Sequence, residues 1–490
     1  MKPLALWLAL GIVASQTSPD NPRNHHNVGP ERFTMRVVAA GLGNPWEITW
    51  GPDGYLWVTE RSAFRVTRIN PADGSKHVAL TLDDAYQSVD QDGLLGLALH
   101  PDLLTGRGRD YVYLAYTHDI DPGPGVTRNL RVRRYTYDRA SQTLVSPIEV
   151  IDGLTAWDDH GGGRLLMGPD AKLYLTRGDQ GNNWLANACY VIRSQELPTA
   201  EEVRARDWSK YQGKILRLNL DGSIPDDNPL FNGVRSHIYT YGHRNPQGLV
   251  FASNGLLYSA EHGPSTDDEL NVITAGGNYG WPLVAGYKDD RSYTYANWSA
   301  SSPEPCKTLK FSSLNIPASV PKTNESEFTG SFVSPLVTFF TVPAGYELAK
   351  SGTATIAPSG LDLYTSKAIP GWSQSLIVTG MRTGAIYRAK LSRDGRHVDG
   401  APFEYFKAAT RYRDLAISPD GLRIYASTDD HGATMGDRGQ TAGVLANRRL
   451  HDISFHPIQL AKLRGQAIDD SSSQRLDHHA LIEDPRREVA

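Results

Sequence analysis

The segment from Gly242 to Pro282 brings together the residue types that a polar binding site requires. It begins with Arg244, Asn245 and Gln247, a cation and two amides that flank Pro246. Because proline fixes φ and lacks an N–H donor, the sequence predicts a loop at a strand edge that holds these three side chains rigidly. A cation and neighbouring amides in such a loop can bind a polar ligand.

The second half of this segment carries oxygen atoms suited to a metal ion. A strand expected over 255–260 leads to the turn EHGP at 261–264, where the Gly-Pro step can direct carbonyl oxygens toward a cavity. Three acids follow, Asp267, Asp268 and Glu269, and hard oxygen ligands of this kind are what Ca²⁺ requires. Spacing alone also allows a surface turn whose acids are solvated, because isolated acidic turns are common.

Further loops place polar side chains at expected strand ends. Gln91 precedes the run DGLLG, His160 lies between acids and glycines in WDDHGGGR, and Asp179 lies in RGDQ. Glycines allow a histidine to approach a ligand closely, and a neighbouring carboxylate can hold its tautomer and raise its basicity. His160 is therefore a candidate general base, although a lone histidine in a loop also fits a packing or surface role.

Two basic segments lie toward the C-terminal end of the chain. Arg382 follows the apolar strand SLIVTG, and Arg411 and Arg413 stand two positions apart just before the strand LAIS. Side chains at alternate positions of a strand point to the same face, so this pair of guanidinium groups can bind one polyanion. The alternative is a pair of rim salt bridges to acids such as Asp414 and Glu404.

One phrase recurs along the chain, a Gly/Pro/Asp turn followed by a strand that ends in a polar residue. Its copies are WGPDGYLWVTE from Trp50, LHPDLLTGRGRDYVYLAYT from Leu99, MGPDAKLYLTRGD from Met167, FASNGLLYSAEHG from Phe251 and ISPDGLRIYASTDD from Ile417. Repeated strand–turn–strand units are typical of a β-propeller. We therefore predict an all-β, six-bladed β-propeller with four-stranded antiparallel blades over 35–455, with a β-sandwich array as the alternative. A propeller gathers its loops over one end of the channel, where the polar loops would meet.

Both ends of the chain are expected to lie outside the propeller. Residues 1–18 join Lys2 to an apolar run too short to span a bilayer, which predicts a secretory signal peptide and export to the periplasm. Residues 19–34 are expected to form an N-terminal extension. The polar composition of 456–490 predicts a disordered tail.

Charge and cysteine content narrow the class of protein. A net charge of −4 without a basic stripe excludes a nucleic-acid partner. The two cysteines, Cys189 and Cys306, can form one disulfide in an oxidising compartment, and the sequence leaves open whether they pair.

Taken together, these segments resemble the soluble PQQ-dependent glucose dehydrogenases and, more broadly, the PQQ-dependent aldose sugar dehydrogenases. The resemblance runs from about Asn44 to Asp430. Its carriers are DGLLG from Asp92, DDHGGGRL from Asp158, GDQGNN from Gly178, YQGKILRLNLDGSIPDDNPLFNGV from Tyr211, GHRNPQG from Gly242, GPSTDDELN from Gly263, GGNYGWPLVAGYKDD from Gly276 and RYRD from Arg411. The resemblance implies a periplasmic quinoprotein that uses PQQ and Ca²⁺.

The resemblance also implies a role for each candidate residue. His160 would take the proton of the anomeric hydroxyl, Asp179 would orient His160, and Gln91 would contact sugar and quinone. Arg244 would stabilise negative charge on the quinone oxygen. The other implied cofactor contacts are Asn245, Gln247, His262, Thr355, Arg382, Arg411 and Arg413. The last two would neutralise the carboxylates of PQQ.

Two calcium sites are implied in the same way. The backbone carbonyls of Gly263 and Pro264 would bind the Ca²⁺ that polarises the cofactor. A second, structural Ca²⁺ associated with a homodimer would be bound by Glu269, Tyr279, the Ala285 carbonyl, Asp289 and Glu325.

The chain departs from the glucose enzymes around the sugar. Arg382 stands where they have a lysine, so a planar guanidinium group replaces a compact ammonium group. Thr353 falls where they have a tryptophan that packs on the sugar, and Trp184 and His262 each replace a glutamine. We therefore expect an open site that binds aldoses weakly and distinguishes poorly among them.

The sequence thus predicts an aldose 1-dehydrogenase that makes lactones and passes electrons to an external acceptor. One alternative is a Ca²⁺-dependent propeller hydrolase of the lactonase kind, and another is a cofactor-free propeller that serves as a binding module. Neither alternative requires Arg382, Arg411 and Arg413 to face one channel, so the position of these cations distinguishes the three.

Overall fold

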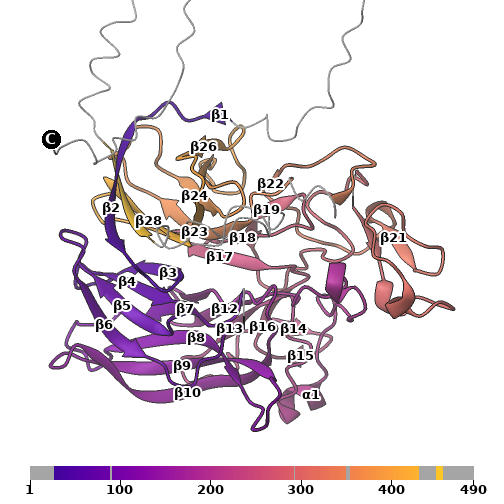
Figure 1. The fold of residues 1–490 in the computed structure, drawn as a ribbon, viewed down its shortest axis with the longest axis horizontal. Helices are drawn as coiled ribbons and strands as arrows, with labels where there is room; N and C mark the ends of the chain where they lie inside the picture. Colours follow the sequence, from indigo (N-terminus) through magenta and orange to yellow (C-terminus); the bar gives the residue numbers. More distant parts are fainter. Residues whose placement is uncertain (1–26, 89–90, 292, 349–353, 430–448, 456–490) are drawn as a thin grey trace, which may run out of the picture.

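The computed structural model describes residues 27–88, 91–291, 293–348, 354–429 and 449–455. Its strands form six antiparallel four-stranded sheets around a common axis (Figure 1), which confirms the predicted six-bladed β-propeller. From the inside outward, the first three blades are β3 (Pro45–Trp50), β4 (Leu56–Glu60), β5 (Arg65–Ile69) and β6 (Lys76–Thr81); β7 (Leu94–Leu99), β8 (Tyr111–Asp119), β9 (Arg128–Asp138) and β10 (Thr143–Thr155); and β11 (Leu165–Met167), β12 (Leu173–Arg177), β13 (Lys214–Leu218) and β16 (Ile238–Tyr241).

The remaining blades follow the same plan, with the N-terminal strands added at their outer edges. They are β17 (Pro246–Phe251), β18 (Leu257–Glu261), β19 (Asp268–Ile273) and β22 (Val337–Phe339); β23 (Pro358–Tyr364), β24 (Ser375–Gly380), β25 (Ala385–Lys390) and β26 (Phe403–Tyr405); and β27 (Arg411–Ile417), β28 (Arg423–Asp429), β29 (Arg449–Phe455) and β2 (Phe33–Ala40). The short strand β1 (Asn27–Val28) extends the fifth blade by pairing in parallel with β26.

The ring is closed by a strand from the N-terminal end of the described chain. β2 is the outermost strand of the last blade, where it pairs antiparallel with β29 and sets Phe33 opposite Phe455. The inner strands β3, β7, β11, β17, β23 and β27 each contact the next, and β27 contacts β3. The closure therefore joins residues from both ends of the propeller. The predicted leader 1–18 and tail 456–490 lie outside the described residues.

The recurring turn phrase occupies one place in the blades. Each copy spans the hairpin between the first and second strands of blades one, two, three, four or six. In several copies an Asp or Asn side chain accepts a hydrogen bond from the backbone N–H two residues on, as Asp53 does from Tyr55 (3.2 Å) and Asp420 does from Leu422 (2.9 Å). This local bond tightens the turn and explains why the phrase recurs.

The apolar core lies between the blades. Buried clusters join each pair of consecutive blades around the ring. Trp57 of β4 packs with Tyr116 of β8 in one cluster, and Ile377 of β24 packs with Ile424 of β28 in another. Because both faces of each blade are buried, the sheets hold their inner strands at fixed positions around the axis.

Two insertions extend from blades three and four. The first, between β12 and β13, contains η2 (Leu185–Asn187) and α1 (Ala200–Ala205); the hairpin of β14 (Leu230–Phe231) and β15 (Val234–Arg235) follows β13. The second carries β20 (Thr294–Ala296), η3 (Trp298–Ala300), η4 (Cys306–Thr308), β21 (Lys322–Asn324) and η5 (Glu325–Glu327), and its β21 region stands out to one side in Figure 1. A disulfide between Cys189 and Cys306 joins the two insertions across 117 residues of sequence. Within the described ranges, no helix has the length and apolar character to span a membrane.

Candidate active site

His160 and Asp179 meet at one end of the third blade. His160 lies in the loop before β11 and Asp179 lies directly after β12, and these strands are antiparallel, so the two loops share one end of the sheet. Nδ1 of His160 lies 2.6 Å from Oδ1 of Asp179, and both side chains are buried. Gly178 permits this approach, because a Cβ atom there would lie 1.9 Å from the carbonyl oxygen of His160.

The Asp179 carboxylate is held by several donors. Oδ1 also accepts the backbone N–H of Gly181 at 2.9 Å, and Oδ2 accepts the indole N–H of Trp281 at 2.8 Å. The backbone N–H of Asp179 in turn donates to the carbonyl of Arg244 at 2.7 Å. A carboxylate on Nδ1 selects the tautomer in which Nδ1 carries the proton, which leaves Nε2 of His160 with a lone pair that can accept one.

Asp159 connects the histidine loop to Gln91. Its Oδ1 accepts the side-chain N–H of Gln91 at 2.6 Å and the backbone N–H of His160 at 2.9 Å, and it lies 3.7 Å from Nε2 of His160. His160 adopts a left-handed φ of 43°, which these contacts hold in place. The sequence identified Asp159 only as a neighbour of the histidine, because its bond to Gln91 spans blades two and three.

Arg244 and Asn245 carry buried donors that no described residue satisfies. The backbone N–H of Arg244 donates to the Glu261 carboxylate, and its guanidinium lies 5.3 Å from the ring centroid of Trp281. Oδ1 of Asn245 accepts the Gly162 N–H at 3.3 Å. Among the described residues, however, Nε of Arg244 and Nδ2 of Asn245 have no hydrogen-bond partner. Buried donors of this kind fit a ligand with acceptor oxygens.

Arg411 and Arg413 of β27 both approach Asp429 of the neighbouring strand β28, although the register of the two strands shifts between Tyr412 and Asp414. Nε of Arg411 is 3.1 Å and Nε of Arg413 is 3.7 Å from the Asp429 carboxylate, and Nη1 of Arg413 donates to Oε1 of Gln247 at 3.0 Å. Burial, opposed in part by Asp429 and reinforced by the nearby cations Arg61, Arg411 and Arg164, lowers the pKa of Arg413 to about 9. Asp429 attracts the pair but leaves an excess of positive charge.

The alternative salt bridges to Asp414 and Glu404 do not form, and the acid that approaches both arginines is Asp429. Asp414 instead pairs with Arg164 at 3.0 Å, while Glu404 lies 3.5 Å from Lys407. These acids therefore do not neutralise Arg411 and Arg413, because Asp414 points to the buried cation of another blade. The remaining positive charge favours the polyanion interpretation over the salt-bridge interpretation.

His262 shows that these residues from different blades surround one space. Burial lowers the pKa of His262 well below its usual value, and the positive charges of Arg244 and Arg413 act in the same direction. His262 is therefore neutral at physiological pH. The backbone N–H of His262 donates to the carbonyl of Asn245 at 3.3 Å, and the loop of Asn245 contacts Asp179 of blade three and Arg413 of blade six, so the loops of blades three, four and six meet here.

Thr355 and Arg382 lie on the adjoining edge of blade five. Oγ1 of Thr355 donates to Oδ2 of Asp268 at 2.6 Å, and the backbone N–H of Arg382 donates to the carbonyl of Ile356 at 3.0 Å. The two predicted cofactor contacts are thus joined through neighbouring backbone. Thr353, the position of the missing tryptophan, lies outside the described residues.

The acids after the Gly-Pro turn are occupied by protein donors. Oδ1 of Asp268 accepts the Gly263 N–H at 2.9 Å, and its Oδ2 accepts the N–H groups of Ile356 (2.7 Å) and Ala357 (3.1 Å). Asp268 therefore fixes the turn against blade five. In the described part of the chain, no cluster of three or more His, Cys, Asp or Glu side chains is arranged to hold a metal. The carbonyls of Gly263 and Pro264 remain the predicted ligands.

Some of the residues expected around the structural calcium lie near one another, because Glu269 and Glu325 both contact the segment 285–289. Oε1 of Glu269 accepts the Gly286 N–H at 2.7 Å, and Glu325 accepts the N–H groups of Ala285 at 2.9 Å and Asp289 at 3.2 Å. Burial raises the pKa of Glu269 to about 8 and that of Glu325 to about 7. The Tyr279 hydroxyl donates instead to the carbonyl of Val272 at 2.7 Å.

Comparisons with known proteins agree with this geometry. The glucose/sorbosone dehydrogenase family profile matches residues 42–312 and 342–436. Quinoprotein glucose dehydrogenase B of Acinetobacter calcoaceticus is 42% identical over 91% of this chain and 96% of its own length. An aldose sugar dehydrogenase of Escherichia coli (strain K12) is 26% identical over 82% of this chain and 91% of its own. The PQQ-bound aldose sugar dehydrogenase of Streptomyces coelicolor is a similar solved structure, with a TM-score of 0.58, 25% identity and coverage of 87% and 99% of the two chains.

Proposed function

Because this chain belongs to the glucose/sorbosone dehydrogenase family, we propose that it oxidises the C1 hydroxyl of aldoses to lactones, using PQQ and Ca²⁺, and passes the electrons to an external acceptor. The observation that carries this proposal is the buried pair of His160 and Asp179 beside an excess of arginine charge. A base next to a cationic pocket suits proton removal from a sugar hydroxyl that lies beside an anionic cofactor. Export to the periplasm and a calcium-linked homodimer belong to the same proposal.

The residues present fit a tricarboxylate cofactor. Arg411 and Arg413 would hold its carboxylates, and the unsatisfied donors of Arg244 and Asn245 would meet its oxygens. Gln247 already donates to Gln91 at 3.4 Å and accepts from Arg413, so it would fix the position of both neighbours. Bound PQQ supplies the acceptor for the hydride that leaves sugar C1, and Ca²⁺ increases its electrophilicity.

The chain's own residues handle the proton. Nε2 of His160 accepts the proton of the anomeric hydroxyl, which leaves the oxygen's electron pair to form the C1=O bond of the lactone. Asp179 stabilises the imidazolium through the 2.6 Å contact at Nδ1. The same contact orients the imidazole ring, since Oδ1 of Asp179 also accepts the Gly181 N–H at 2.9 Å.

Calcium would be bound by backbone carbonyls of the Gly263-Pro264 turn. The turn is fixed by the bond from the Gly263 N–H to Asp268, and only glycine fits there, since a Cβ atom would lie 1.8 Å from the Thr266 carbonyl. A rigid turn can hold its carbonyl oxygens toward a cation without the reorganisation that a mobile loop requires.

Reconstitution tests the function directly. The purified protein is incubated with PQQ and Ca²⁺, and reduction of a redox dye is followed with a panel of aldoses. The proposal expects dye reduction that requires PQQ, Ca²⁺ and sugar together. Lactone hydrolysis with Ca²⁺ alone would favour the hydrolase, and sugar binding without turnover in the loaded protein would favour the binding module.

A further inference from the structure

Trp281 connects the carboxylate that orients the base to the cation of the next blade. Its indole N–H donates to Oδ2 of Asp179 at 2.8 Å, and its ring centroid lies 5.3 Å from the guanidinium carbon of Arg244. The side chain is only 5% exposed. The backbone N–H of Asp179 also donates a hydrogen bond to the carbonyl of Arg244 at 2.7 Å. The three residues therefore contact one another in a closed unit.

We propose that Trp281 is a positioning residue for the oxidation of the sugar. A carboxylate rotates easily about its last bond unless both oxygens are held. Oδ1 of Asp179 is held by the Gly181 N–H and by His160, and Oδ2 is held by Trp281. The indole N–H fixes the plane in which Asp179 meets Nδ1 of His160. The indole ring fixes the guanidinium of Arg244 by a cation–π contact.

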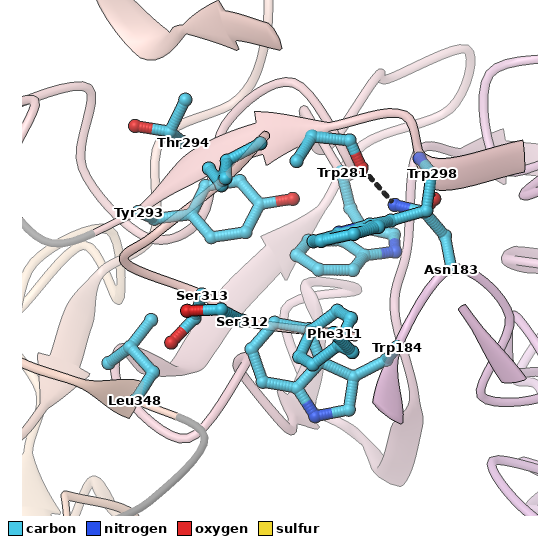
Figure 2. A pocket seen from close by; sticks show the side chains of 12 residues that line it. Asn183, Trp184, Trp281, Tyr293, Thr294, Trp298, Phe311, Ser312, Ser313 and Leu348 are labelled. Atoms are coloured by element: carbon cyan, nitrogen blue, oxygen red, sulfur yellow. Dashed lines mark hydrogen bonds between the residues drawn. The ribbon is translucent and has the colours of Figure 1, made fainter. Parts of the chain in front are cut away.

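The same side chain also belongs to the packing of the second insertion, so the test must separate the two roles. Figure 2 shows the pocket that Trp281 lines together with Trp184, Trp298 and Phe311. Trp281 packs on Tyr293 with ring centroids 5.2 Å apart, and Trp298 packs on Phe311 at the same separation. Trp298 is 2% exposed, and it therefore provides a matched control in the same pocket.

The kinetic test rests on the proposed dehydrogenase function and uses the PQQ- and Ca²⁺-loaded protein. Trp281→Phe keeps an aromatic ring under Arg244 but removes the N–H, and kcat should fall roughly tenfold, the range for one hydrogen bond to a charged group. KM for glucose and the affinity for PQQ should change by less than about twofold. Trp281→Leu, which also removes the ring, should lower kcat further. Trp298→Phe should leave kcat unchanged.

A double-mutant cycle asks whether Trp281 acts through Asp179. In an Asp179→Asn background, Trp281→Phe should change kcat by less than about twofold, because the carboxylate it positions is already gone. Effects that multiply in the double variant would overturn the proposal. So would a Trp281→Phe enzyme with wild-type kcat, or one whose loss is matched by Trp298→Phe.

A measurement without cofactor keeps the proposal testable if the protein turns over no aldose or if Trp281→Phe fails to fold. In apoprotein labelled with ¹⁵N-tryptophan, the indole N–H resonance of Trp281 should move upfield in Asp179→Asn, an isosteric variant, while that of Trp298 stays in place. A Trp281 resonance that does not move would overturn the proposed bond. Absence of dehydrogenase activity with a shifted resonance would count against the function and support the contact.

Discussion

Replacement of Arg413 by methionine should stabilise the cofactor-free protein while it weakens PQQ binding. Burial and nearby cations lower the pKa of Arg413 from 12.5 to about 9. The folded-state pKa lies below the unfolded value, so the charged group destabilises the fold below pH 9, and this cost is relieved as pH rises from about 9 toward 12.5. The difference between the two pKa values corresponds to roughly 5 kcal/mol at neutral pH, which is an upper limit for the stability that Arg413→Met can add.

The expected gain is smaller because Arg413 also donates hydrogen bonds to Oε1 of Gln247 (3.0 Å) and Oγ of Ser359 (3.3 Å), which methionine cannot make. The Arg413→Met apoprotein should therefore be more stable by about 1–3 kcal/mol at pH 7 once the loss of these hydrogen bonds is subtracted. PQQ would lose a buried partner for a carboxylate, which costs roughly 2–5 kcal/mol and raises Kd by about 30-fold to 5000-fold. Urea unfolding of the apoprotein and fluorescence titration with PQQ measure the two effects separately.

Arg164 provides the matched control. It is buried near the same channel, but Asp414 and Glu47 raise its pKa because both acids bind it directly. Arg164→Met should destabilise the fold by roughly 3–5 kcal/mol, since it leaves two buried acids without a partner. An Arg413→Met protein that loses stability in the same way and binds PQQ as the wild type does would refute the cofactor role of Arg413.

Three further outcomes are expected. His160→Ala should lower the rate of sugar oxidation by roughly 10²–10⁴-fold with little change in the PQQ titration, and an equal loss of PQQ binding would identify His160 as a cofactor ligand instead. Gly178→Ala should lower kcat by at least about tenfold, because its Cβ would collide with the His160 carbonyl and displace the base; wild-type kcat would contradict that geometry. Glucose, galactose, xylose and maltose should have kcat/KM values within about tenfold and KM values in the millimolar range or above, and a preference above a hundredfold would show that Trp184, His262 or an unidentified loop rebuilds a selective pocket.

The local features of the fold could be predicted from the sequence, and its closure could not. The turn phrase identifies hairpins because the hydrogen bond that tightens each turn is local. It joins an Asp or Asn side chain to the backbone N–H two residues on, as at Asp53 and Asp420. The pairing of β2 with β29 depends on residues near opposite ends of the chain, and no local pattern encodes it. The Cys189–Cys306 disulfide joins two insertions and was equally invisible in the spacing.

The candidate site shows the same division. The spacing of Arg411 and Arg413 predicts that both side chains reach one partner, and both approach the carboxylate of Asp429 in β28, not that of the adjacent Asp414. Asp268 was expected to be free for a metal, whereas it accepts backbone donors from blade five. The sequence presents Trp281 only as part of a motif, because its hydrogen bond to Asp179 joins separate blades. Long-range hydrogen bonds require the fold, and sequence spacing does not supply them.

A single-turnover experiment tests the central claim most directly. The PQQ- and Ca²⁺-loaded protein is mixed with glucose in the absence of oxygen and of any electron acceptor, and the cofactor absorbance and the lactone formed are measured together. The account predicts rapid reduction of the cofactor with one lactone per loaded site, slowed by roughly 10²–10⁴-fold in His160→Ala. A wild-type protein that binds PQQ but leaves it oxidised in the presence of every aldose, or a His160→Ala protein that reduces it at the wild-type rate, would contradict the account.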